Sequence, residues 1–157
     1  MVLDYLNRIK LIEKAPDLSE GDIARIIQTR PSGTHFFNVV LLNKAIVSAV
    51  PSVEFSPEYK AHTLRDIEKE LELRYPVIVW IVTTDEAGND YIHSIVVTGI
   101  DTNQNVIHYN DPTYGKKAEQ LSQFLAKWEK HGARMVKVQI GRLVRKTLEE
   151  WTPQEVA

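Results

Sequence analysis

Apolar residues recur every three or four positions in several stretches of this chain, and that spacing predicts amphipathic helices. Ser19, with Asp22 three positions later, is suited to begin one helix, and Thr34 and Thr63 are suited to begin two others. The pattern predicts helices over residues 1–14, 19–27, 34–47, 63–73, 118–130 and 143–151.

Other stretches are rich in β-branched residues and are bounded by turn-forming residues, which is typical of strands. Residues 77–82 are aliphatic apart from Trp80, and such an unbroken run favours a strand in the middle of a sheet. Residues 85–90 and 101–105 are rich in Asp and Asn and predict two hairpin turns. Further strands are expected over residues 92–98, 106–111 and 134–140, with residues 51–57 as a loop or an edge strand.

The order of these elements predicts the fold class. Helices come first and a mostly antiparallel sheet comes later, which indicates an α+β fold with N-terminal helices packed on the sheet. The length of 157 residues suits one domain. We expect this domain to span residues 1–141 and to be followed by a C-terminal helix and tail over residues 142–157.

Composition excludes several classes of function. A hydrophobic fraction of 43% and a formal net charge of −2 are ordinary for a globular protein, and they offer nothing to recruit nucleic acid or an anionic membrane. No apolar run approaches the roughly 18–20 residues of a membrane-spanning helix, and no signal peptide is visible. The cytoplasm is therefore the default compartment. The chain contains no cysteine, which excludes disulfides.

The hairpin over residues 92–111 carries the strongest candidate chemistry. If its turn is centred near Asn103, His93 faces Thr113, and Asp111 is a diagonal neighbour on the same face. Diagonal Cα atoms lie about 7–8 Å apart, a distance that an imidazole and a carboxylate can span. A carboxylate against one ring nitrogen fixes the tautomer and orients the other nitrogen toward a substrate or nucleophile. His93 and Asp111 are the candidate catalytic pair, provided that no bulge changes this register.

The motifs of the hairpin have a familiar order. Residues 93–97 are His-Ser-Ile-Val-Val, residues 99–101 are Gly-Ile-Asp, and residues 110–112 are Asn-Asp-Pro. Together they resemble the His–Asp half of a papain-like cysteine peptidase of the bacteriocin-processing, double-glycine-leader type. The resemblance extends to the strand at residues 75–82 and the helix at residues 121–128. It implies a papain-like α+β fold in which His93 is the acid–base residue and Asp111 orients it.

The nucleophile of that family has no counterpart in this sequence. In the family a cysteine opens the first helix, whereas this chain begins Met-Val-Leu and contains no cysteine at any position. The resemblance implies a papain-like domain that is truncated at its N-terminus. A shortened gene model, a shortened polypeptide and a natural pseudo-enzyme all predict such a sequence. We expect the missing turn to expose apolar surface near Val2, Leu3 and Leu6, and this surface to favour self-association through the N-terminal helix.

The other polar candidates are better explained as structural residues. His108 does not share the strand face of Asp111, and three further histidines lie near predicted helix ends; these are His35, His62 and His131. Ser32 is a weak candidate nucleophile because its neighbours fit a loop and the Gly-x-Ser-x-Gly pattern is absent. Neither a zinc-binding spacing nor a glycine-rich phosphate loop occurs, so we expect no metal and no cofactor.

Two functions remain open on sequence alone, because a fold does not determine what its site does. The first is a cysteine peptidase-like domain that keeps His93 and Asp111 but is inactive in this form for want of a nucleophile. The second is a non-catalytic module that binds a peptide or protein partner in the remaining cleft. Three large aromatic residues are candidates to line that cleft, although aromatics on strands more often belong to the core; they are Trp80, Tyr109 and Tyr114.

Overall fold

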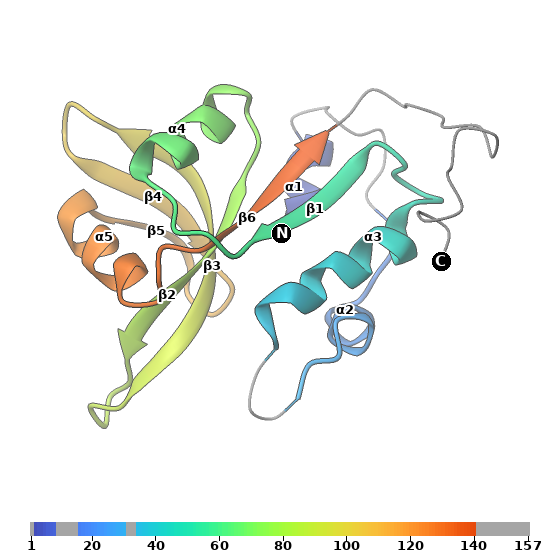
Figure 1. Cartoon of the computed structure of the whole chain (residues 1–157), viewed down its shortest axis with the longest axis horizontal. Helices are drawn as coiled ribbons and strands as arrows, with labels where there is room; N and C mark the ends of the chain where they lie inside the picture. Colours follow the sequence, from blue (N-terminus) through green and yellow to red (C-terminus); the bar gives the residue numbers. More distant parts are fainter. Residues whose placement is uncertain (1, 9–15, 31–33, 141–157) are drawn as a thin grey trace.

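The computed structural model describes residues 2–8, 16–30 and 34–140, and its elements are shown in Figure 1. The helices are α1 (Val2–Arg8), α2 (Glu20–Ile26), the 3-10 helix η1 (Phe36–Val40), α3 (Leu41–Ile46), α4 (Leu64–Glu72) and α5 (Leu121–Glu129). The strands are β1 (Val53–Glu58), β2 (Val77–Thr84), β3 (Asp90–Asp101), β4 (Val106–Asp111), β5 (Gly115–Gln120) and β6 (Met135–Ile140). No helix among these residues is long and apolar enough to cross a membrane.

The six strands form one antiparallel sheet in the order β1-β6-β2-β3-β4-β5. The aliphatic strand β2 has β6 on one side and β3 on the other, which confirms its predicted interior position. The strand β1 lies at an edge of the sheet and contains Pro57. Proline is tolerated in an edge strand because it has no N–H to donate, and one side of such a strand has no neighbouring strand to accept hydrogen bonds. The α+β class with an antiparallel sheet is therefore confirmed.

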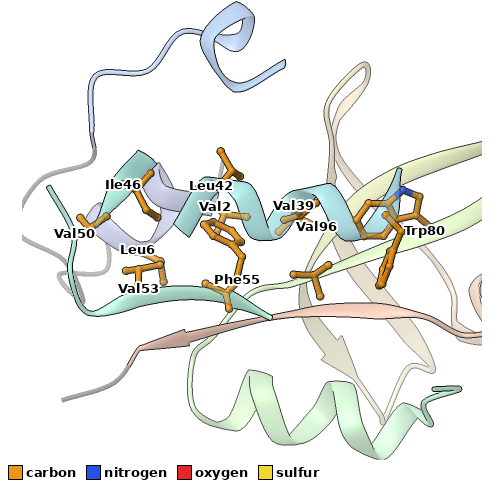
Figure 2. Packing of buried hydrophobic residues seen from close by; sticks show 13 residues of the cluster. Val2, Leu6, Val39, Leu42, Ile46, Val50, Val53, Phe55, Trp80 and Val96 are labelled. Carbon is orange, nitrogen blue, oxygen red and sulfur yellow. The ribbon is translucent and has the colours of Figure 1, made fainter. Parts of the chain in front are cut away.

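Helices cover both faces of the sheet. Figure 1 shows α1, α2 and α3 on one side, with α4 and α5 on the other. Each side has its own buried cluster, and β2 contributes to both because side chains alternate along a strand. Trp80 packs with the N-terminal helices, whereas Val79 and Ile81 pack with α5. Figure 2 shows the first cluster, in which residues of α1, η1 and α3 lie against β1 and the middle of the sheet.

The apolar residues of α1 are not exposed, contrary to the expectation from sequence. Val2 and Leu6 are both buried, and Leu3 is half-buried. Figure 2 shows the reason for Val2 and Leu6, which lie among residues of η1, α3 and β1. The surface that was expected to drive self-association is therefore packed inside the molecule.

The helix predicted over residues 34–47 begins differently in the structure. Its first part is the 3-10 helix η1, and the residue that precedes it is His35, whose Nδ1 accepts a hydrogen bond from the Phe37 N–H at 3.3 Å. Thr34 is not the cap because its hydroxyl lies 2.7 Å from the hydroxyl of Thr29. The predicted caps Ser19 and Thr63 are confirmed, each in a capping box with an aspartate three residues later.

The prediction of a helix from residue 118 was also wrong at its start. Residues 115–120 form β5, which pairs along its whole length with β4, and α5 begins only at Leu121. No apolar alternation marks β5, because nearly all of its residues are exposed at the edge of the sheet. The predicted helix over residues 143–151 and the second half of the first predicted helix lie outside the described residues.

Candidate active site

The pairing of β3 with β4 decides whether His93 and Asp111 share a face. Next to the turn, Asp101 pairs with Val106 and Gly99 pairs with His108. Beyond Thr98 the pairing shifts by one residue, so that Val97 pairs with Tyr109 and Val96 with Asn110. Thr98 is thus the extra residue of a β-bulge.

The bulge at Thr98 brings the candidate pair together. With the register that holds next to the turn, Asp111 would fall opposite Val96, whose side chain points away from the face of His93. With the shifted register, Asp111 falls opposite Ile95, which shares a strand face with His93. The turn is centred half a residue later than the sequence predicts, and the predicted register contains no bulge. The two errors cancel, so the expected register is found at this end of the hairpin.

His93 and Asp111 are in direct contact. The Nε2 atom of His93 lies 3.0 Å from Oδ2 of Asp111, a hydrogen-bonding distance for a ring N–H and a carboxylate. Both side chains are largely buried, with 14% and 8% of their surfaces exposed. Since Asp111 occupies Nε2, the neutral ring carries its proton there, and Nδ1 is the nitrogen left to exchange a proton with another group.

The carboxylate of Asp111 is held from two sides. Its Oδ1 accepts hydrogen bonds from the N–H groups of Thr113 and Tyr114, at 2.8 and 3.0 Å, in the turn that follows β4. Burial by itself raises the pKa of Asp111, but these two backbone donors and His93 outweigh it and leave the pKa below its ordinary value of 3.8. Asp111 is therefore ionised at neutral pH, as a residue that orients an imidazole must be.

A cleft of about 620 Å³ lies between the N-terminal helices and the sheet, and residues 92–96 of β3, including His93, are among those that line it. Val2 of α1, Phe36 of η1 and Trp80 of β2 contribute to its walls. Pro112, the residue after Asp111, also lines it. A volume of this size is ordinary for a site that binds a small ligand or part of a peptide chain.

The structure separates the remaining candidates. Trp80 lines the cleft, but Tyr109 packs in the cluster on the α5 side, and Tyr114 is exposed outside the cleft. His108 is exposed on β4, and Ser32 lies outside the described residues. Within the described part of the chain, no group of three or more His, Asp or Glu side chains is placed to hold a metal ion.

Several cleft residues were not expected from the sequence, because they come from loops far apart in the chain. Tyr59 and Arg134 were not candidates, and His35 and His131 were expected to be only structural. His35, Tyr59, His131 and Arg134 all line the cleft, although no local motif marks them. His62, by contrast, is buried away from the cleft, with Nε2 3.3 Å from a Glu58 carboxylate oxygen. Its position agrees with the structural role expected for it.

The fold has known counterparts. The peptidase domain of Streptococcus ComA, described as a bi-functional ABC transporter involved in a quorum sensing pathway, superimposes with a TM-score of 0.61 at 18% identity; the match covers 89% of this chain and 88% of that domain. A protein described as a C39-like peptidase from Bacillus anthracis matches with a TM-score of 0.49 at 15% identity, over 70% of this chain and 60% of that one. The first of these similarities supports the expected papain-like fold. No curated protein sequence matches the chain.

The sequence itself matches a family model, described as papain-like cysteine protease AvrRpt2, over residues 7–129. This segment includes the β3–β4 hairpin, both members of the His93–Asp111 contact and most of the cleft wall. The match confirms the expected superfamily, even though the printed sequence contains no cysteine. The chain belongs to the papain-like cysteine protease family represented by AvrRpt2.

Proposed function

We propose that the cleft beside His93 is a peptide-binding site with the acid–base half of a cysteine peptidase, in which His93 transfers protons and Asp111 orients it. The observation that carries this proposal is the contact between His93 Nε2 and Asp111 Oδ2 at the wall of a cleft of about 620 Å³. An imidazole fixed in this way can accept a proton at Nδ1 and later return it to a leaving amine.

The same proposal predicts that this polypeptide does not cleave peptides by a thiol mechanism. In a papain-like site, His takes the thiol proton, the thiolate attacks the peptide carbonyl, and the amine leaves with the proton that His returns. The printed sequence has no thiol to supply that bond. His93 can still activate a water molecule, but without covalent catalysis the rate of hydrolysis is expected to be poor.

The test compares two polypeptides against one mixed peptide library. The first is the chain as printed, and the second also carries any residues that are encoded in frame before Met1. If those residues include a cysteine, we expect no turnover by the first polypeptide and clear turnover by the second. His93→Ala should abolish that turnover, whereas His108→Ala should not, since His108 is an exposed histidine on the neighbouring strand. Turnover that survives His93→Ala would overturn the assignment of His93.

A second function follows if no cysteine is encoded there. The chain would then be a non-catalytic peptide-binding module, and the open, mostly apolar cleft favours this candidate. Peptides should then shift the ring resonances of His93 in NMR spectra without being cleaved. Peptides that leave these resonances unchanged would contradict binding in the cleft.

A further inference from the structure

The cleft beside His93 has an unusual balance of charge. The chain as a whole carries a formal net charge of −2, yet among the residues that the structure describes, those that line this cleft include no Asp or Glu. Arg134 is the one permanently charged residue among the described residues that line it. The adjoining hollow of about 430 Å³, which shares Val2 and Ile23 with the cleft, does contain an acidic residue, Glu20. The absence of acidic side chains is therefore a local property of the cleft.

The guanidinium of Arg134 lines the cleft without an anionic partner among the described residues. Among residues 2–8, 16–30 and 34–140, no carboxylate lies within ion-pair distance of this guanidinium. Its Cζ atom lies 5.6 Å from the centre of the Tyr59 ring, which orients the guanidinium by a cation–π contact. The neighbouring His131 adds little charge, because burial and the charge of Arg134 lower its pKa below 6.5.

Aromatic rings form the surface next to this cation. Phe36 meets Trp80 edge to face, with ring centres 4.8 Å apart. Tyr59 stacks on Phe37 at 5.1 Å, and these two rings are 52% and 42% exposed. Exposed aromatic residues beside a cleft are typical of binding surfaces, since they offer rigid apolar area at little cost in entropy.

We propose that this cleft selects peptides in which an apolar side chain is followed by a carboxylate, with the apolar group on the aromatic surface and the carboxylate on Arg134. An apolar side chain loses water on the exposed ring of Tyr59 and on the small parts of Phe36 and Trp80 that line the cleft, while the carboxylate accepts charge-assisted hydrogen bonds from the guanidinium. A basic side chain in the second position meets Arg134 with like charge and is rejected. The inference rests on the proposed function, because it names the class of peptide for the same site.

The test uses blocked peptides that differ only in the residue after a leucine, which is Glu, Gln or Lys. Binding to the full chain is measured by calorimetry, and occupancy of the cleft by the NMR shifts of the His93 ring. We expect the Glu peptide to bind about tenfold more tightly than the Gln peptide, because one charge-assisted hydrogen bond changes binding affinity by about this factor. The Lys peptide should bind most weakly, and added salt should reduce the differences.

Matched variants assign the preference to one side chain. Arg134→Gln should abolish the advantage of the Glu peptide. Arg134→Lys keeps the positive charge and should keep part of that advantage, and it provides a second measurement if Arg134→Gln fails to fold. Arg65→Gln removes the same charge from α4, where Arg65 pairs with Glu68 and Glu72, and should leave the preference unchanged.

Three further outcomes distinguish this inference from the proposed function. If the Glu and Gln peptides shift the His93 ring equally and bind with equal affinity, the carboxylate preference is wrong and peptide binding at the cleft stands. If none of the three peptides shifts the His93 ring but peptides of the mixed library do, the preference is wrong and the proposed function stands. If no peptide of either set shifts it, both are wrong.

Discussion

Asp111 shows how a buried carboxylate is kept charged. Its pKa lies below 3.8 because the N–H groups of Thr113 and Tyr114, together with His93, outweigh the effect of burial. A carboxyl whose folded pKa is lowered binds protons more weakly when folded, so its stabilisation is present above pH 3.8 and is lost as the pH falls through the folded pKa. Asp111→Asn keeps an acceptor oxygen but not the charge. We therefore expect the difference in unfolding free energy between wild type and Asp111→Asn to shrink below pH 3.8.

Urea denaturation of both proteins, from neutral to acidic pH, measures this difference. A second carboxylate, Asp85, serves as control, since its pKa is also lowered by hydrogen bonds from the backbone but it is exposed in the β2–β3 turn. Asp85→Asn should change the acid dependence less than Asp111→Asn. A difference in unfolding free energy between wild type and Asp111→Asn that stays constant at every pH would contradict the charge argument.

Two glycines of the hairpins should respond oppositely to alanine. Gly99, beside the bulge, has no positive φ, and an added Cβ would meet the His108 side chain at an ordinary 3.9 Å. Gly115 opens β5 with a φ of +75°, where a side chain is strained even in open space. Gly99→Ala should be neutral or stabilising by up to about 1 kcal/mol, whereas Gly115→Ala should cost about 1–2 kcal/mol. Thermal unfolding of the two variants checks this, and equal effects would contradict it.

The helices α2 and α4 begin with the same capping arrangement but differ in what they bury. Asp22 accepts from the N–H of Ser19 at 3.1 Å, and Asp66 accepts from the N–H of Thr63 at 2.9 Å. The helix α4 buries Ile67 completely, while α2 has no fully buried residue. The cap of α4 is thus coupled to the core of the whole molecule, and the cap of α2 is coupled mainly to its own helix.

Asp66→Ala should therefore lower the global free energy of unfolding by about 1 kcal/mol, the usual value of a cap. Asp22→Ala should change global stability less and should instead speed amide hydrogen exchange within α2. Denaturant melts and native-state exchange of both variants measure the two effects. Equal losses of global stability would show that α2 is as tightly coupled to the core as α4.

The elements also show which features a sequence reveals. The strand β2 was predictable because a strand buried on both faces is apolar throughout, and the capped starts of α2 and α4 carry side chains that bond to their own backbone. The strand β5 was not predictable, because it is held by pairing with β4 and has no apolar face. Local propensity does not encode such pairing.

The parts of the site that lie on one hairpin were predictable from the sequence, and the parts that come from separate loops were not. His93 and Asp111 lie on one hairpin, so their proximity follows from spacing once the register is known. The bulge at Thr98, which sets that register, is marked in the sequence only by Gly99, a glycine in the interior of a strand. Arg134 and Tyr59 meet only in the folded chain, because they are brought together by the packing of separate loops.

The arrangement of the whole molecule ties the cleft to the sheet. The N-terminal helices form one wall of the cleft and pack on one face of the sheet. The opposite face of the same sheet packs against α5. Trp80 and Val79 are neighbours in β2 but belong to opposite clusters. Since the two clusters share this strand, neither side of the sheet can lose its packing without affecting the other.

This shared sheet predicts that both layers unfold in one transition. Trp80 reports on the N-terminal layer and Trp128 on the α5 layer, so each can be kept alone by replacing the other and Trp151 with Phe. Trp128→Phe also removes the hydrogen bond from its Nε1 to the Arg134 carbonyl, so the two proteins will differ in absolute stability. The comparison is therefore made within each protein, between tryptophan fluorescence and far-ultraviolet circular dichroism during urea unfolding. We expect the two signals to coincide in both proteins, as a two-state transition requires. A Trp80 fluorescence signal that changes at a lower urea concentration than the circular dichroism would show instead that the N-terminal helices unfold before the sheet. The cleft beside His93 would then be lost while the sheet stays folded.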